Sequence, residues 1–312
     1  MQLLKRVVNR IKIVFSDKLT QALYFKGIPL ADITHNTLNK SLQFIKLNCE
    51  IPLSYNADFL INSYGYAKKI KETHQAKFIW TGSELHLEIN NVIHHVQTEE
   101  DIFILYEIHV DGVYNYVYRL PHNVFDIGMN VSFSSLYFAG RSNVVEIHSF
   151  EPFKPTFNQA LKNQSLNPEI SKKIKSYNFG LGEKDESLQL KYNYDWKGSA
   201  GIDGIPDRLS DKLKDSNQEI EMRAVNFLDT IKFSNADLPI GVKIDCEGAE
   251  YAIVKSIILL PFFDKVQWVL MEWHEKVPLL LLESLTSAGF SAISLLPHSK
   301  GTGMIYAFRQ LK

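Results

Sequence analysis

Hydrophobic positions change their spacing along the chain, and the change separates two regions. From residue 123 onward, short and largely apolar runs alternate with stretches in which apolar residues recur at helical spacing. The runs predict strands at 124–127, 144–150, 242–244 and 266–271. The stretches between them predict helices at 133–139, 157–163, 251–260 and 277–288. Strands that are largely apolar on both faces are typical of a parallel sheet covered by helices on both sides, so this region predicts an α/β fold.

The region before residue 120 has a different pattern. Residues 78–96 form short apolar or alternating runs separated by turns at Thr81-Gly82 and Asn90-Asn91, which predicts a β-meander. Its adjacent histidines, His94 and His95, would point to opposite faces of a strand, so we do not expect them to share a metal ion. Residues 99–110 open with three acids, as helices do, but their β-branched residues are also typical of a strand. We therefore divide the chain into an N-terminal α+β segment, 1–119, and an α/β domain, 120–312.

Residues 1–16 place apolar side chains on one face of a helix and basic side chains elsewhere. One interpretation is a helix that packs on the protein's own body or on a partner chain. The other is a basic amphipathic helix at a membrane surface, which would make the protein peripheral at the inner membrane face. No apolar run approaches the roughly 18 to 20 residues that span a bilayer, so we expect no integral membrane segment.

Composition excludes several classes of protein. With 34 basic and 35 acidic side chains, the formal net charge is -1, which argues against a general nucleic-acid binder. The two cysteines, Cys49 and Cys246, cannot form the disulfide framework of a small secreted protein. A cytoplasmic location fits this cysteine content.

The first candidate site lies where a strand turns into a helix, at residues 124–136. The strand ends near Asp126, turns through Gly128, and the helix begins among polar residues that include Asn130 and Ser132. Glycine allows a close approach of the backbone, and a helix N-terminus offers free N–H groups, so this geometry suits a nucleotide-type cofactor. A strand-to-helix connection that binds no ligand would show the same short sequence motif.

The second candidate site, Glu151, follows the next strand about 20 residues later. An acid at this position of a Rossmann-like unit accepts hydrogen bonds from a ribose diol. Pyrophosphate-binding loops usually carry G-x-G-x-x-G, whereas this chain has Asn130 and Ser132 where further glycines would stand. The pattern therefore favours a cofactor without a diphosphate, and S-adenosylmethionine meets that description.

Four segments in this order resemble the FkbM-type methyltransferases. They are V-x-D-x-G-x-N-x-S at 124–132, F-E-P at 150–152, L-D at 228–229 and K-I-D-x-E-G-x-E at 243–250, with a related lead-in at 107–114. The resemblance implies a class I methyltransferase fold: a Rossmann-like, seven-stranded and mostly parallel sheet with an antiparallel last strand. It also implies S-adenosylmethionine as the cofactor and a hydroxyl group as the methyl acceptor. Met129 and Ser132 depart from the family pattern, and a Ser with positive φ would cost on the order of 1 kcal/mol.

The third candidate site gathers acids after the strand at 242–244. Asp245, Glu247 and Glu250 lie where strand becomes helix, and the strand at 266–271 delivers Trp273 and His274 to the same sheet edge. Three interpretations stay open for the acids: catalysis or substrate binding, a structural role at a helix N-terminus, and a divalent metal site. We expect Asp245, Glu247 and His274 to be catalytic, Glu250 and Trp273 to contact the substrate, and no metal to be required.

The last candidate is the long insert at 183–219, which is rich in aromatic residues and glycines. We expect Tyr194 and Trp196 to contact the substrate as part of a lid or acceptor wall, although a peripheral hairpin is the alternative.

Together these features predict an O-methyltransferase that acts on a sugar, a glycan precursor or a related small metabolite. The alternatives are a non-catalytic cofactor-binding module and a nicotinamide-dependent oxidoreductase. The sequence identifies neither the acceptor nor the oligomeric state.

Overall fold

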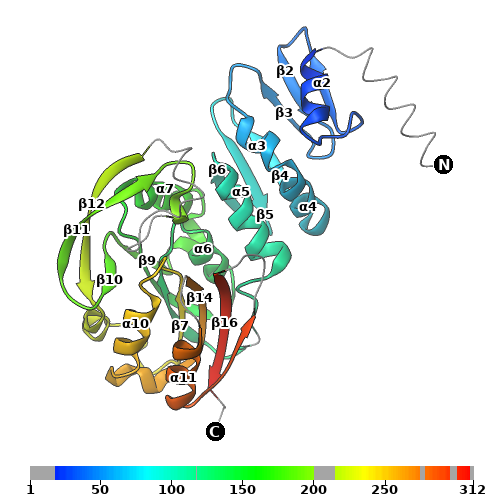
Figure 1. Cartoon of the computed structure of the whole chain (residues 1–312). Helices are drawn as coiled ribbons and strands as arrows, with labels where there is room; N and C mark the ends of the chain where they lie inside the picture. The colour runs from blue at the N-terminus through cyan, green and yellow to red at the C-terminus, as the bar shows by residue number, and fades with distance from the viewer. Residues whose placement is uncertain (1–17, 117, 200–214, 275–277, 296–300, 310–312) are drawn as a thin grey trace. The chain divides into compact units, whose positions relative to one another are not determined.

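The computed structural model describes residues 18–116, 118–199, 215–274, 278–295 and 301–309. The chain divides into two compact units, Met1–Gly112 and Val113–Lys312 (Figure 1). The amphipathic segment 1–16, for which membrane contact was one interpretation, lies outside the described residues. Within the described ranges, no helix combines the length and the apolar character needed to cross a bilayer.

The N-terminal unit contains two small antiparallel sheets and several helices. Its first half, which the hydrophobic pattern did not predict, is α2 (Lys18–Phe25) and a sheet of β1 (Ile33–Asn36), β2 (Ser41–Phe44) and β3 (Cys49–Pro52). Helices α3 (Asp58–Asn62) and α4 (Tyr64–His74) precede the predicted meander, which is confirmed as β4 (Lys77–Trp80), β5 (Leu85–Ile89) and β6 (Val92–Val96).

The ambiguous segment after the meander is helical. Helix α5 (Glu99–Tyr106) continues into a π-helical turn, η1 (Glu107–Asp111). A capping box decides the outcome, because the Thr98 hydroxyl accepts from the N–H of Asp101 while the Asp101 carboxylate accepts from the N–H of Thr98. This reciprocal pair satisfies two N–H groups at the helix start, which outweighs the β-propensity of the residues that follow.

The second unit is built on a seven-stranded sheet with the strand order β15-β16-β14-β13-β7-β8-β9. In chain order the strands are β7 (His122–Ile127), β8 (Val144–Phe150), β9 (Ile174–Tyr177), β13 (Ile240–Ile244), β14 (Val266–His274), β15 (Phe290–Leu295) and β16 (Thr302–Arg309). All neighbouring pairs are parallel except those that involve β16. The predicted class I methyltransferase sheet is therefore confirmed, including its antiparallel last strand.

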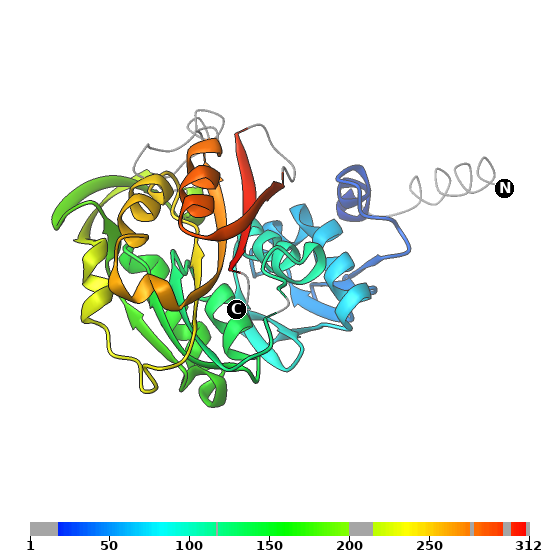
Figure 2. The ribbon, with the colours of Figure 1, turned by 90° about the horizontal axis from the view of Figure 1, so that it is seen from below.

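Helices cover both faces of this sheet (Figure 2). Helix α6 (Phe133–Ala139) lies on one face, where Phe138 contacts Trp268 of β14. Helices α10 (Glu250–Ile257) and α11 (Leu279–Ser287) lie on the other face and share a core with Val269, Met271 and Trp273 of the same strand. Alternate residues of β14 thus enter different cores, which explains why its run from Trp268 to Met271 has no polar break. The other helical segments are α7 (Lys154–Ser165), α8 (Pro168–Ser171), η2 (Lys197–Ser199), η3 (Val225–Thr230) and η4 (Pro261–Lys265).

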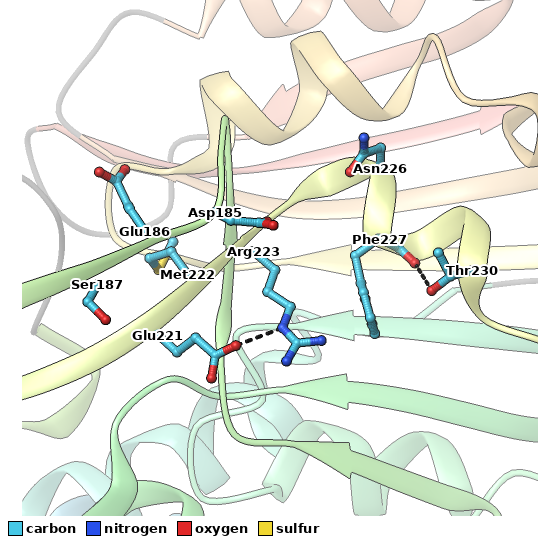
Figure 3. Close-up of a pocket in the computed structure, with 9 residues that line it drawn as sticks. All are labelled: Asp185, Glu186, Ser187, Glu221, Met222, Arg223, Asn226, Phe227 and Thr230. Carbon is cyan, nitrogen blue, oxygen red and sulfur yellow. Dashed lines mark hydrogen bonds and ion pairs between the residues drawn. The ribbon is translucent and has the colours of Figure 1, made fainter.

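The long insert forms part of a separate three-stranded sheet. Strands β11 (Glu186–Asn193) and β12 (Asp215–Ala224) are antiparallel, and β10 (Gly180–Gly182) runs parallel to β12. An open cleft of about 600 Å³ lies where β11 begins and β12 ends, beside η3 (Figure 3). The cleft is lined by residues 185–187, 221–223, Asn226, Phe227 and Thr230, and none of the candidate site residues belongs to it. The described part of the insert thus contains an antiparallel pair of strands, and its role as a lid or acceptor wall stays a prediction.

The connections after β7 and β13 contact each other through Gly128. Gly128 has a φ of +79°, and a Cβ atom built on it would lie 1.8 Å from the carbonyl oxygen of Asp245. The close approach predicted for this glycine is therefore made to the neighbouring connection of the same sheet.

We predict that Gly128→Ala destabilises the second unit by about 3 kcal/mol or more, because both the backbone conformation and the contact with Asp245 oppose a side chain. Thermal unfolding followed by circular dichroism would measure this change. Gly65→Ala is the matched control, because Gly65 lies inside α4 with nothing within 4 Å of the added Cβ. An equal melting temperature for the Gly128 variant and the wild type would contradict the prediction.

Candidate functional site

The first candidate residue, Asp126, is fully buried at the end of β7. One carboxylate oxygen accepts hydrogen bonds from Ser134 Oγ at 2.8 Å and Ser135 Oγ at 2.6 Å, both on α6. The other oxygen lies 3.3 Å from the ammonium of Lys243. Asp126 was predicted to bind the cofactor, but its contacts instead join the strand end to the following helix and to β13.

Lys243 links the two halves of the site. Its buried ammonium donates to the carbonyl oxygen of Gly128 and lies 3.5 Å from Asp245 Oδ2. The ring of Tyr114 lies 5.6 Å from the same nitrogen, and the Tyr114 hydroxyl donates to Asp245 Oδ2 at 3.1 Å. Burial disfavours the charged ammonium, but Asp126 and Asp245 outweigh it and hold the pKa of Lys243 above its ordinary value. The lysine is therefore a fixed positive charge between two acids.

The connection after β7 adopts the left-handed conformation at two positions besides Gly128. Asn130 has a φ of +50° and Ser132 a φ of +72°. The predicted strain at Ser132 is thus present, and its buried hydroxyl accepts a hydrogen bond from Gln164. Met129 packs against Phe157 and Ala160 of α7, so it is directed into a core. The Oδ1 atom of Asn130 is buried and has no hydrogen-bond partner among the described residues, which makes it an available acceptor for a ligand.

Glu151 directly follows β8, and its carboxylate is buried. Its Oε1 accepts the backbone N–H of Phe153 at 2.9 Å. Burial raises the pKa of Glu151 to about 7, although hydrogen bonds from the backbone of Phe153 and Asn130 oppose the shift. The acid predicted to bind ribose therefore lies beside the loop that contains Asn130.

Glu250 supports the turn between β13 and α10. Its carboxylate is fully buried and accepts the backbone N–H groups of Cys246 and Gly248, each at 2.9 Å. The same carboxylate accepts a hydrogen bond from Nδ1 of His274 at 3.0 Å. Both carboxylate oxygens of Glu250 are thus held inside the protein, and its contact with the substrate stays a prediction.

His274 faces three carboxylates from two strand ends. Its Nδ1 contacts Glu250, and its Nε2 lies 3.6 Å from Glu247 Oε1 and 3.7 Å from Glu272 Oε1. Burial alone would lower the pKa of His274, but these acids outweigh it and raise the pKa to about 10. Glu247 has a φ of +47°, and burial raises its pKa to about 8. The acids therefore favour the protonated imidazole, whose N–H groups donate hydrogen bonds, whereas a base needs the neutral form. The role of His274 as a base stays a prediction.

The acids of the third candidate site also include a set suited to a cation. Asp245, Glu272 and His274 each offer one ligand atom, and these three atoms lie within 4.8 Å of one another.

The remaining substrate-binding candidates do not join this group. Trp273 is buried in the core, where its indole N–H donates to Ser294. It was predicted to contact the substrate, but strand alternation turns it away from the face that carries Glu272 and His274. Tyr194 is half exposed and contacts Tyr192, which packs on Phe153 at the start of α7. Trp196 belongs to the same segment, so the aromatic end of β11 lies on the side of Glu151.

Sequence reasoning did not assign a site role to three residues of this network. Tyr114 and Lys243 entered only as members of the segments 107–114 and 243–250, and Glu272 was given no role. The available signal was the position of each residue at a strand end or in the lead-in segment. A buried lysine two positions before an acid on a predicted parallel strand is the clearest of these signals, because such a charge needs partners.

Comparison with known proteins assigns the family. The sequence profile of the Methyltransferase FkbM domain matches residues 126–291. The chain belongs to this family. It is thus an S-adenosylmethionine-dependent methyltransferase and not a nicotinamide-dependent oxidoreductase. A comparison with curated protein sequences finds no match.

Solved methyltransferase structures also resemble the chain. An FkbM methyltransferase from Methylobacillus flagellatus is 14% identical with a TM-score of 0.44, over 66% of this chain and 53% of that chain. The match thus spans about half of the length of that protein. The N-terminal domain of human METTL16, solved with SAH, is 14% identical with a TM-score of 0.38, over 96% of both chains.

The residues at the ends of β7 and β8 fit this cofactor. Glu151 offers a carboxylate for ribose hydroxyls, and Asn130 Oδ1 is an open acceptor for the ammonium of the amino-acid end. Met129 and Ser132, which prompted the alternative of a non-catalytic module, do not obstruct the loop, since one is packed in a core and the other adopts the required φ.

We predict that cofactor binding strengthens as pH rises through 7, because an ionised Glu151 accepts from two hydroxyls whereas a protonated one accepts less well. Between pH 6 and 8 the gain in affinity approaches about tenfold, measured by isothermal titration with S-adenosylhomocysteine. In Glu151→Gln this gain should vanish while ionisation of the ligand itself is unchanged. Parallel pH profiles for the two proteins would refute the assignment of Glu151.

We predict that Glu250→Gln lowers the free energy of unfolding by about 3 kcal/mol, because an amide cannot accept both backbone N–H groups and the His274 imidazole. Denaturant unfolding would measure the loss. Glu169→Gln is the control, since Glu169 forms an exposed surface pair with Lys172 that contributes little. Equal stability of both variants would show that Glu250 does not support the turn.

Proposed function

We propose that this methyltransferase transfers a methyl group to a hydroxyl oxygen of a sugar, a glycan precursor or a related small metabolite. The acids at the ends of β13 and β14 support this proposal. Asp245, Glu247 and Glu272 present carboxylates that are partly exposed, beside the buried His274. Carboxylates accept hydrogen bonds from hydroxyl groups and can take the proton that a hydroxyl loses.

Glu247 is the proton acceptor in this proposal. Asp245 already receives the hydroxyl of Tyr114 and faces Lys243, and Glu250 is committed to the turn. Glu247 lies on the same edge with its carboxylate directed to His274, whose charge holds it in place. S-adenosylmethionine supplies an electrophilic methyl group when bound. Glu247 would take the proton that the acceptor hydroxyl loses, and its raised pKa of about 8 makes the ionised carboxylate a stronger base than an ordinary glutamate.

One observation carries the proposal: the Lys243 ammonium lies between Asp126 and Asp245, 3.3 and 3.5 Å away. The lysine fixes the spacing between the strand end beside the cofactor residues and the strand end that carries the acids. Positioning of the two reactants supplies much of the rate in a direct transfer, so a rigid spacing is what such a reaction needs.

The class of acceptor and the contact with a membrane are also proposals. The formal net charge of -1 supports a small or glycan acceptor over nucleic acid. Peripheral contact with an inner membrane face through residues 1–16 rests on the amphipathic pattern of that segment.

We expect Glu247→Gln to lower turnover by about 100-fold or more while cofactor affinity stays unchanged, because the variant keeps the shape but cannot take the proton. Release of S-adenosylhomocysteine with a panel of sugars, nucleotide sugars and hydroxylated metabolites would identify an acceptor and measure turnover. Glu283→Gln, on the exposed side of α11, is the control. Full activity of Glu247→Gln on the acceptor would overturn its role, and activity only on amines would overturn O-methyl transfer.

A further inference from the structure

Asp245, Glu272 and His274 come from two adjacent strand ends. Strands β13 and β14 are parallel neighbours, with Ile244 opposite Met271. Asp245 follows β13, and Glu272 and His274 are two positions apart on β14, so they share one face of the strand. One ligand atom of each of the three lies within 4.8 Å of the others. The register of the sheet therefore holds two carboxylates and one imidazole around a common point.

The orientation of His274 suits a ligand role. Metal-binding histidines usually donate one ring N–H to a carboxylate, which fixes the tautomer and aims the other nitrogen at the ion. Here Nδ1 contacts the buried Glu250 at 3.0 Å, and Nε2 is directed toward Glu272 Oε1 at 3.7 Å. Glu250 is in turn held by two backbone N–H groups, so the imidazole has a rigid support.

The balance of charge at this edge also favours a cation. The network contains the acids Asp126, Asp245, Glu247, Glu250 and Glu272. Among the described residues, Lys243 lies within 4 Å of Asp126 and Asp245, and His274 lies within 4 Å of Glu247, Glu250 and Glu272. Burial and the repulsion of its negative charge by Asp245, Glu272 and Glu250 raise the pKa of Glu247. The side chains of Asp245 and Glu272 are 26% and 30% exposed, so an ion from solvent can reach their oxygens.

We propose that Asp245, Glu272 and His274 bind one divalent cation of the Mn²⁺ class. Carboxylate oxygens with a single imidazole suit such an ion, and binding would displace the proton from Nε2. Three protein ligands leave about three of six coordination positions open. If the proposed hydroxyl transfer holds, an acceptor with two neighbouring oxygens, such as a sugar diol, could occupy two of them. Cation binding itself does not depend on that function.

The test is a titration of the full chain with Mn²⁺, followed by the electron paramagnetic resonance signal of the free ion. We expect one bound Mn²⁺ per chain in the wild type. Asp245→Asn, Glu272→Gln and His274→Gln should each weaken binding by about tenfold or more, and Glu250→Gln by about 10- to 100-fold. Circular dichroism of each variant, and binding of S-adenosylhomocysteine measured without metal, would show that it is folded.

His86→Ala is the matched control, because His86 and His95 face Glu84 across β5 and β6 and form another His–carboxylate group. It should leave the strong site intact. No bound Mn²⁺ in the wild type, or loss of binding in His86→Ala but not in the three ligand variants, would overturn the site. Methyl transfer that proceeds equally with a chelator would remove the link to the acceptor while leaving the proposed function standing.

Discussion

The buried ammonium of Lys243 is the interaction on which the rest of the site depends. A lone charge in a protein interior is very costly, and this one is tolerated because Asp126, Asp245 and the carbonyl of Gly128 surround it. These partners belong to the connections after β7 and β13. The lysine therefore holds the two strand ends together, and the contact of Gly128 with Asp245 leaves no room for a side chain between them.

The strained backbone of the site follows from that close approach. Gly128, Asn130, Ser132, Glu247 and Gly248 all have positive φ, and all lie in these two connections. Each such non-glycine residue costs on the order of 1 kcal/mol or more, so the surrounding contacts must hold it in place. At Ser132 the bond from Gln164 contributes, and near Glu247 the Glu250 carboxylate binds the turn. Strain and its compensation lie within the same few residues.

The sheet could be predicted from the sequence because apolar runs report burial directly. Strand β8 and helix α6 have the predicted bounds, and β7, β13 and β14 extend the predicted runs by a few residues, whereas β9 was not predicted. The orientation of single side chains could not be predicted, because it depends on tertiary partners. Glu250 faces inward because the backbone of the turn and His274 bind its carboxylate. Trp273 enters the core because successive side chains of β14 point to opposite faces of the sheet. The first small sheet was missed because each of its strands holds only one or two Ile, Leu or Phe residues, so no apolar run marks them.

The two sides of the site differ in how their charges are balanced, and this difference has a chemical consequence. The carboxylate of Asp126 accepts hydrogen bonds from two serine hydroxyls and lies beside the ammonium of Lys243. The negative charge on that side of the site is therefore balanced. Near His274 several carboxylates face one imidazole. An excess of acids at one point favours whatever brings positive charge or acidic protons there. The proposed hydroxyl acceptor and the proposed divalent ion both meet that requirement, so the two proposals rest on the same cluster of acids.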